Sequence, residues 1–204
     1  MIIFLRHAQA TNNVERVLAG RSGGIPLTEL GLQQAEKIAT FLQPLKISAI
    51  YSSPIERATH TAKIVSNKLN IQYEIDERLT EIEMGSFSGM LYEEMFAKHG
   101  NIFLKFYQDN PLIEKNGVET FSNVKKRVLD MVNYCSQKHD NENILLVTHM
   151  DPIKAMISTV LQLKPESLYE LIIRNASLTI VKKEQSNFSM VAINSMSPDR
   201  YYHD

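Results

Sequence analysis

The chain has 204 residues, 44% of them hydrophobic and 22% charged, a balance typical of one globular domain. Its 22 lysines and arginines nearly equal its 23 acidic residues, so no basic excess points to nucleic acid or to a membrane surface. One cysteine, Cys135, excludes a disulfide framework, and we expect it in the core. With no signal-peptide pattern and no apolar run of membrane-spanning length, a cytoplasmic protein is expected.

The first predicted strand covers residues 2–5 and is apolar throughout, as expected of a strand buried on both sides. It ends at two side chains that a core does not need, Arg6 and His7. A Gly-rich loop over residues 20–24 follows. A helix is then predicted from the N-cap candidate Thr28, with its apolar face formed by Leu32, Ala35, Ala39 and Leu42.

A second short apolar strand is predicted over residues 47–51. Directly after it, Ser53 and Glu56 have the spacing of a capping box, and Pro54 occupies the first helical position that proline favours. This pattern places Arg57 in or just after the first helical turn, near the carboxyl end of the strand.

The remaining pattern continues to alternate strands with helices. The clearest buried strand, ILLVTH, ends on the polar pair Thr148 and His149. The other expected elements are a strand over 71–75, a helical insertion over about 85–116, a long amphipathic helix within 116–135, a helix over 152–161, and antiparallel strands over 177–184 and 188–194.

Strands that alternate with helices predict an α/β fold, a three-layer sandwich with a mainly parallel central sheet and helices on both faces. We expect a single domain over residues 1–204, in which residues 86–116 form a lid-like helical insertion over the active site. Ligands of such sheets bind beyond the carboxyl ends of the strands. His7, Arg57 and His149 are therefore expected to converge on one crevice.

Distinct motifs coincide with these strand ends and helix starts: LRHAQATNN, LTELG, SSPIERATHTA, LTEIEMGSFSG, NGVETFSNVKKR and VTHMDPIKA. In this order they resemble the signature segments of the histidine phosphatase superfamily, the phosphoglycerate mutase-like proteins. The first is similar to the family's Arg-His-Gly signature with its downstream asparagine, here Asn13. The resemblance extends over nearly the whole chain.

The resemblance implies a metal-independent phosphatase that acts on a small phosphate ester through a phosphohistidine on His7. Glu81 would be the general acid and then the general base, a double role that a raised pKa favours. We prefer Glu81 to the nearby Glu83 because its offset from Leu79 matches the family pattern. The family's proteins are often dimers, so a homodimer is possible.

Recognition of a phosphate dianion needs donors and positive charge, which Arg6, Arg57 and His149 would supply as catalytic groups. Asn13, Gly20, Arg21 and Met150 are the further candidates for contacts to phosphate or substrate. Two positions depart from the family pattern: Ala8 replaces the usual glycine after the nucleophile, and Met150 replaces the small residue after the second histidine. No ligand spacing predicts a metal site.

Two alternatives stay open. A bisphosphate-dependent phosphoglycerate mutase would use 2,3-bisphosphoglycerate as cofactor, whereas the phosphatase needs none. The larger mutases carry an arginine-rich insertion, but the segment MLYEEMFAKHGNIFLKFYQDNPLIEKN has no arginine, and its aromatic residues include Phe96, Phe103, Phe106 and Tyr107. A non-catalytic phosphate-binding module is the other alternative, although such a binder would have no use for the acid Glu81.

Overall fold

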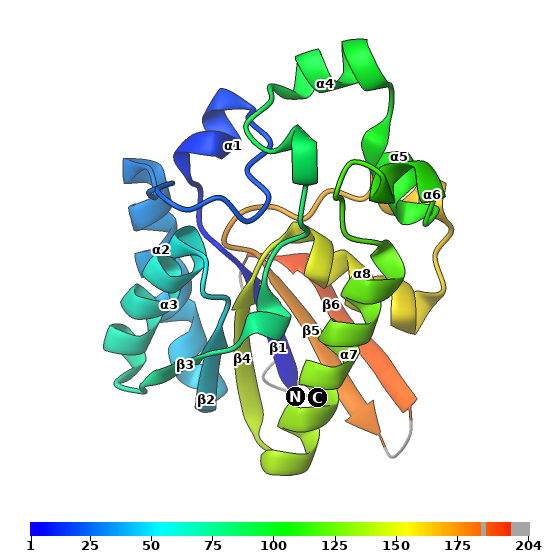
Figure 1. Cartoon of the computed structure of the whole chain (residues 1–204). Helices are drawn as coiled ribbons and strands as arrows, with labels where there is room; N and C mark the ends of the chain where they lie inside the picture. The colour runs from blue at the N-terminus through cyan, green and yellow to red at the C-terminus, as the bar shows by residue number, and fades with distance from the viewer. Residues whose placement is uncertain (185–186, 197–204) are drawn as a thin grey trace.

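The structure is a computed structural model that describes residues 1–184 and 187–196. A six-stranded sheet in the order β3-β2-β4-β1-β5-β6 lies at its centre (Figure 1). The strands β1 to β4 are parallel, β5 runs antiparallel to β1, and β6 runs antiparallel to β5. The strand bounds are β1 Ile2–Arg6, β2 Ile47–Ser52, β3 Tyr73–Ile75, β4 Asn143–Thr148, β5 Leu178–Glu184 and β6 Asn187–Ser195.

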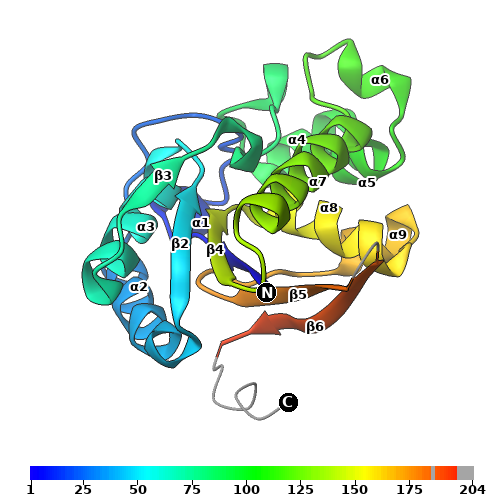
Figure 2. The same ribbon diagram turned by 90° about the horizontal axis from the view of Figure 1, so that it is seen from below.

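Helices cover both faces of this sheet, which confirms the predicted α/β sandwich. Figure 2 shows α2 and α3 on one face and α7 and α8 on the other. Within the described residues, no helix has both the length and the apolarity needed to cross a membrane. The helix bounds are α1 Thr11–Glu15, α2 Glu29–Leu42, α3 Glu56–Leu69, α4 Tyr92–His99, α5 Ile102–Tyr107, α6 Pro111–Glu114, α7 Phe121–Lys138, α8 Met150–Leu161 and α9 Pro165–Glu170.

The alternation of side chains along β1 divides the core into two clusters. Ile3 and Leu5 pack with the apolar face of α2 and α3, whereas Ile2 and Phe4 pack with α7 and α8. Burial of each such side chain contributes about 1.5–3 kcal/mol, so both faces of the strand hold it in the sheet. Because both of its faces are buried, β1 has no polar residue before Arg6. Arg6 and His7 therefore lie at the carboxyl-terminal end of this strand.

The helix starts show one correct and one wrong prediction. The Thr28 side chain accepts a hydrogen bond from the Gly31 N–H and caps α2 as predicted. The predicted capping box of α3 is wrong, because α3 begins at Glu56 with Ile55 as its N-cap residue. Ser53 lies in the turn before the helix, where its hydroxyl instead accepts from the Ile55 N–H at 3.3 Å.

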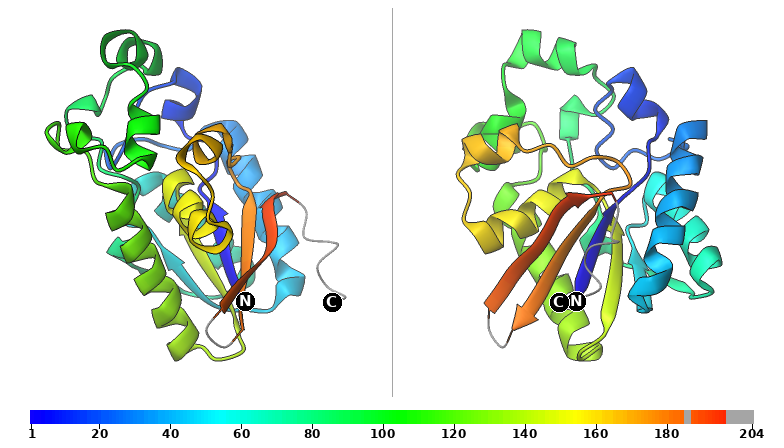
Figure 3. Two further views of the ribbon diagram at one scale, coloured as in Figure 1. Left: turned by 90° about the vertical axis from the view of Figure 1, so that its right-hand side faces the viewer. Right: turned by 180° about the vertical axis from the view of Figure 1, so that it is seen from behind.

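The helices α4, α5 and α6 lie beyond the carboxyl ends of the parallel strands (Figures 1 and 3). Aromatic packing of Phe106 and Tyr107 against Phe121 joins α5 to the start of α7. A short bridge between Val17 and Leu91 joins this segment to the loop after β1. That the segment acts as a lid stays a prediction.

Candidate active site

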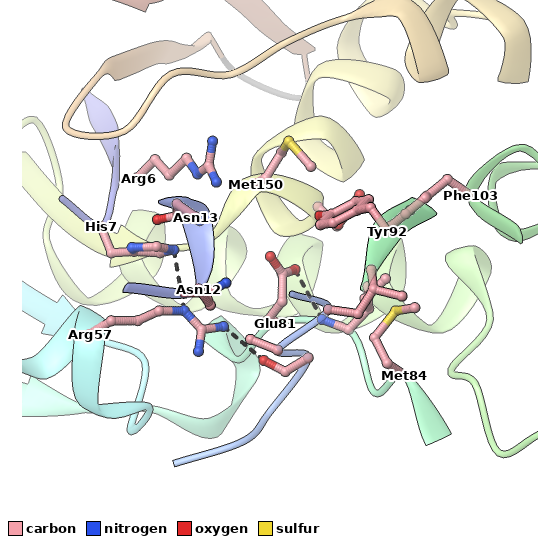
Figure 4. Close-up of a pocket in the computed structure, with 15 residues that line it drawn as sticks. Arg6, His7, Asn12, Asn13, Arg57, Glu81, Met84, Tyr92, Phe103 and Met150 are labelled. Carbon is pink, nitrogen blue, oxygen red and sulfur yellow. Dashed lines mark hydrogen bonds between the residues drawn. The ribbon is translucent and has the colours of Figure 1, made fainter. Parts of the chain in front are cut away.

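A hollow of about 410 Å³ lies at the carboxyl ends of β1 and β4 (Figure 4). Its lining comes from distant parts of the chain: Arg6 at the end of β1 and His7 directly after it, Arg57 from α3, Glu81 from the loop after Leu79, and Met150 and Asp151 from α8. The remaining lining residues are Asn12, Asn13, Leu18, Ala19, Gly20, Ile82, Met84, Tyr92 and Phe103. The structure thus brings together most of the residues that the sequence singled out.

His7 is buried and neutral. Its Nδ1 lies 2.8 Å from the carbonyl oxygen of Ala8, which only accepts, so Nδ1 carries the proton and Nε2 keeps its lone pair. Burial, with the nearby Arg57 and Arg6 guanidinium groups, lowers the pKa of His7 well below its usual value. The Arg57 Nε–H donates to Nε2 at 3.3 Å. A neutral imidazole whose second nitrogen carries no proton is the state that a nitrogen nucleophile requires.

The backbone of His7 is fixed on both sides. Its N–H donates to the Thr148 carbonyl at 2.9 Å, and its carbonyl accepts from the Asn175 side chain at 3.0 Å. The Asn175 side-chain amide also donates to the side-chain oxygen Oδ1 of Asn13 at 3.1 Å. Asn175 therefore connects the loop before β5 to the site, although no motif in the sequence marked it.

Three buried nitrogen donors around His7 have no hydrogen-bond partner among the described residues: Nε of Arg6, Nη1 of Arg57 and Nδ1 of His149. Buried donors are almost always paired, so this group points to a ligand rich in acceptors. The other guanidinium nitrogens anchor the side chains, since Arg6 Nη1 donates to the Ile173 carbonyl and Arg57 Nη2 donates to the Gly20 carbonyl at 2.7 Å. An anion of phosphate size matches such charged donors.

His149 lies directly beside His7, with 5.1 Å between the ring centroids. Its Nε2 is 2.8 Å from the Ser53 hydroxyl, which also accepts from the Ile55 N–H at 3.3 Å. In the tautomer in which the Ser53 hydroxyl donates to Nε2, the proton of the neutral imidazole is on Nδ1. Burial and the Arg57 charge lower the pKa of His149 well below its usual value. His149 is fully buried and is not itself a lining residue of the hollow.

Glu81 is the carboxyl group that faces these donors. Burial, followed by the negative charge of Asp151, raises the pKa of Glu81 to about 7, although Arg57 and Arg6 oppose the shift. Its Oε1 accepts from the Ile82 N–H at 3.0 Å. Near neutral pH this carboxyl group exists in both protonation states, so it is able both to donate and to accept a proton.

Two arginines hold the segment that carries Glu81. Arg127 of α7 donates to the carbonyls of Arg78, Thr80 and Glu81, and it also pairs with Glu119. Arg21 donates to the Glu81 carbonyl at 3.0 Å and to Glu119 at 2.9 Å. Arg21, a predicted substrate contact, is therefore engaged with Glu119 and does not line the hollow.

The other predicted contacts do lie at the hollow. Asn13 uses its side-chain oxygen for the Ala10 N–H and for Asn175, and among the described contacts its amide nitrogen stays available as a donor. Gly20 has φ +47°, and a Cβ there would contact Met84 at 3.0 Å, so glycine fits this position. Met150 lines the wall at the start of α8.

Several lining residues were missed by the sequence analysis. Asp151 follows Met150 directly, and an acid in the first turn of a helix was a signal that could have been noticed. Tyr92 was not singled out, and Phe103 was named only among the aromatic residues of the insertion; both line the hollow, and Phe103 is also buried in the core. Within residues 1–184 and 187–196, no group of three or more His, Cys, Asp or Glu residues is arranged to hold a metal ion.

Comparisons with known proteins agree with this geometry. The sequence profile of the histidine phosphatase superfamily (branch 1) matches residues 2–196. A 2,3-bisphosphoglycerate-dependent phosphoglycerate mutase of Thermoplasma acidophilum is 35% identical over 184 residues, 89% of this chain and 86% of that protein. A protein of Hydrogenobacter thermophilus named putative phosphoserine phosphatase 2 is 30% identical over 202 residues, 98% of this chain and 97% of that protein.

Among solved structures, that of YhfR from Bacillus stearothermophilus superposes with a TM-score of 0.86 at 29% identity, covering 95% of this chain and 96% of the other. A phosphoserine phosphatase of Entamoeba histolytica has the same fold, with a TM-score of 0.83 at 23% identity, covering 96% of each chain. The profile match spans nearly the whole chain, and the relatives are enzymes that act as phosphatases or mutases. The chain is an enzyme of the histidine phosphatase superfamily.

Proposed function

We propose that the protein is a phosphomonoesterase that hydrolyses a small-molecule phosphate ester through a phosphohistidine on His7. The observation that carries this proposal is the set of unpartnered buried donors around a neutral imidazole, Nε of Arg6, Nη1 of Arg57 and Nδ1 of His149. Donors that are held in place before the substrate binds need little reorganisation when negative charge develops near them, which is the main source of catalysis in phosphoryl transfer.

In the first step, the Nε2 lone pair of His7 attacks phosphorus and the bond to the alcohol oxygen breaks. The protonated Glu81 gives its proton to the departing oxygen, so the alcohol leaves neutral. The Arg6 and Arg57 guanidinium groups offset the charge on the phosphoryl oxygens. The Ala8 carbonyl stabilises the positive charge that spreads over the imidazole, because it accepts from Nδ1–H at 2.8 Å.

In the second step, water attacks the phosphohistidine. The Glu81 carboxylate now takes a proton from that water, and the P–N bond breaks to restore the neutral imidazole and release phosphate. A pKa of about 7 suits Glu81 to both directions of proton transfer at neutral pH. A module that only binds phosphate would have no use for a proton donor and acceptor such as Glu81 beside the anion.

The experiment is turnover of 4-nitrophenyl phosphate and of alkyl phosphates in EDTA, with phosphate release as the readout. We expect hydrolysis in the chelator, inhibition by vanadate as a five-coordinate phosphoryl analogue, and an acid-labile phosphoenzyme after quenching. Absence of hydrolysis for every ester would exclude the proposal.

A phosphoglycerate mutase is the second candidate, because the 35% identical relative from Thermoplasma acidophilum carries that name. A mutase must also hold a second anionic group. Of the residues that line the hollow, the permanent cations are Arg6 and Arg57, and the same lining includes the acidic residues Glu81 and Asp151. Incubation with 3-phosphoglycerate and a trace of 2,3-bisphosphoglycerate distinguishes the two candidate functions. A mutase would accumulate 2-phosphoglycerate, whereas a phosphatase would accumulate free phosphate.

A further inference from the structure

A second hollow, of about 530 Å³, adjoins the one that contains His7. The two hollows share the lining residues Tyr92, Phe103 and Met150. Figure 4 shows Tyr92 and Phe103 on the side of the catalytic hollow opposite His7. Their rings are stacked, with 5.6 Å between the centroids, whereas the unbranched side chain of Met150 adapts to what lies beside it. The second hollow is therefore next to the place where the organic part of an ester would lie.

Apart from Lys154, the side chains that line only the second hollow are aromatic or aliphatic. They are Phe96 from α4, Tyr107 from α5, Tyr169 from α9, and Leu171 and Ile172 from the loop after α9. Ile172 is 69% exposed, so this wall of the hollow is open to water. Hollows with such walls bind apolar ligands, because removal of both apolar surfaces from water is favourable.

The loop after α9 connects the second hollow to the donors around His7. Ile172 lines the second hollow, and the carbonyl of the next residue, Ile173, accepts from Nη1 of Arg6. The Ile173 side chain is itself fully buried in the core. The apolar wall and the guanidinium group are thus held relative to each other by one short piece of backbone.

The charged groups between the two hollows pair with one another. The Tyr107 hydroxyl donates to Oδ1 of Asp151 at 2.5 Å, and the Lys154 ammonium donates to the Tyr107 oxygen at 3.0 Å. The ammonium nitrogen also lies 4.9 Å from the centroid of the Tyr107 ring, a favourable position for a cation. Lys154 and Asp151 are both buried, and they offset each other's charge.

The charges of the site therefore balance when the ester has an uncharged alcohol. A phosphate dianion matches the positive charges of Arg6 and Arg57. Glu81 enters the reaction protonated and neutral, and Lys154 offsets Asp151. An ammonium or a carboxylate group on the alcohol would add an uncompensated charge in a poorly solvated place, which is costly.

We propose that the substrate is the phosphate ester of an uncharged, mainly apolar alcohol, whose organic part occupies the second hollow. This inference rests on the proposed phosphatase function. It assigns part of the choice of substrate to Phe96, Tyr169 and Ile172, which line the second hollow and not the one that contains His7.

Alkyl phosphates test the inference, because their leaving groups have nearly the same reactivity along the series. We expect kcat/KM to rise at least about thirtyfold from methyl phosphate to hexyl phosphate, since each buried methylene contributes about fourfold. The charged esters of equal length, 5-aminopentyl phosphate and 4-carboxybutyl phosphate, should each be hydrolysed at least about tenfold less efficiently than hexyl phosphate, because burial of an unpaired charge is costly.

Two variants ask whether the second hollow is the cause of this preference. Ile172→Asp places a charge on its wall at an exposed position, where the core is not disturbed. The ratio of kcat/KM for hexyl phosphate to that for methyl phosphate should fall at least about fivefold in this variant and in Phe96→Ala, because apolar contact is lost. Ile75→Asp, the same change at a position on β3 that is 50% exposed, should retain the wild-type ratio.

Equal kcat/KM for hexyl and methyl phosphate in the wild type would overturn the inference. Hydrolysis of either charged ester as efficient as that of hexyl phosphate would do the same, and so would an unchanged ratio in Ile172→Asp or in Phe96→Ala.

If no ester is hydrolysed, the proposed function fails, and binding still decides the role of the second hollow. Calorimetry with hexylphosphonate and methylphosphonate, which contain no ester bond, measures that binding. Tighter binding of hexylphosphonate by the wild type, with the difference reduced in Ile172→Asp, would support an apolar site there. Equal binding of the two phosphonates would contradict it.

Discussion

The two ends of the hollow are built in different ways. At the end proposed to bind phosphate, called the phosphate end, Arg6 is the last residue of β1, and His7 and His149 directly follow β1 and β4. Backbone hydrogen bonds from Arg6 to Ser177 and from His7 to Thr148 fix the first two of these residues. At the opposite end, Tyr92 and Phe103 come from the short helices α4 and α5. The Tyr92 N–H donates to the Arg16 carbonyl at 2.9 Å, and the Tyr92 and Phe103 rings stack on each other. The phosphate end is therefore suited to the one group that all phosphate esters share. The other end is suited to the alcohol part of the ester, which differs from one ester to another.

The two ends of the hollow also use different kinds of interaction. The phosphate end uses charge-assisted hydrogen bonds whose strength depends on angle and distance. The far end uses apolar contact, which tolerates small shifts. Substitutions at the phosphate end should therefore affect every ester alike, whereas substitutions at the far end should change the preference among esters.

The largest effect is expected for His7→Ala, which removes the proposed nucleophile. Turnover of every ester should fall by at least ~10⁴-fold, because the remaining donors bind phosphate but offer no atom to accept it. Circular dichroism should show an intact fold. His60→Ala, a change on α3 outside the hollow, is the matched control. A phosphoenzyme that still forms in His7→Ala would place the nucleophile elsewhere.

Glu81→Gln should lower turnover of alkyl phosphates by ~10²–10⁴-fold, because the leaving alcohol then departs without a proton. With 4-nitrophenyl phosphate, whose leaving group needs little protonation, a burst of nitrophenol followed by a slow phase is expected. The wild-type rate of the first step should fall as pH rises through about 7, where Glu81 loses its proton. A pH limb near 7 that persists in Glu81→Gln would assign this titration to another group.

Arg127→Met tests whether the hydrogen bonds from Arg127 to the backbone of residues 78–81 position the Glu81 carboxyl group. We expect kcat for alkyl phosphates to fall about tenfold, or about 1.4 kcal/mol, with KM nearly unchanged, because the phosphate donors stay in place. The pH limb assigned to Glu81 should shift in this variant, and Arg127→Lys should recover part of the rate. Lys126→Met, at the exposed neighbouring position, serves as control. Equal losses of kcat in the Met and Lys variants without a pH shift would indicate a merely structural role.

The smallest effect is expected at the apolar end. Phe103→Ala should lower kcat/KM for naphthyl phosphate about fivefold, or ~1 kcal/mol of lost apolar contact, and should leave methyl phosphate nearly unaffected. Leu112→Ala, at a position on α6 that is 55% exposed, is the control. Equal losses for the large and the small ester would mean that Phe103 supports the fold rather than the substrate.

The sequence alone determined the sheet and the phosphate end. Apolar runs of strand length ended at Arg6–His7 and at Thr148–His149, and the carboxyl ends of parallel strands meet at one edge, so the convergence of these residues followed from pattern and topology. The N-cap of α2 at Thr28 could also be predicted from the sequence, because an N-cap residue bonds to the backbone of the helical turn that directly follows it.

Tertiary structure decided what depends on contacts between distant segments. Arg21 was predicted to bind substrate, but Glu119, far along the chain, engages it. Ser53 was predicted to cap α3, but its hydroxyl bonds to His149. The pKa of Glu81 and the partners of Asp151 likewise depend on burial and on charges from other elements. A local pattern records which side chains are present, whereas their ionisation and their partners depend on neighbours that only folding supplies.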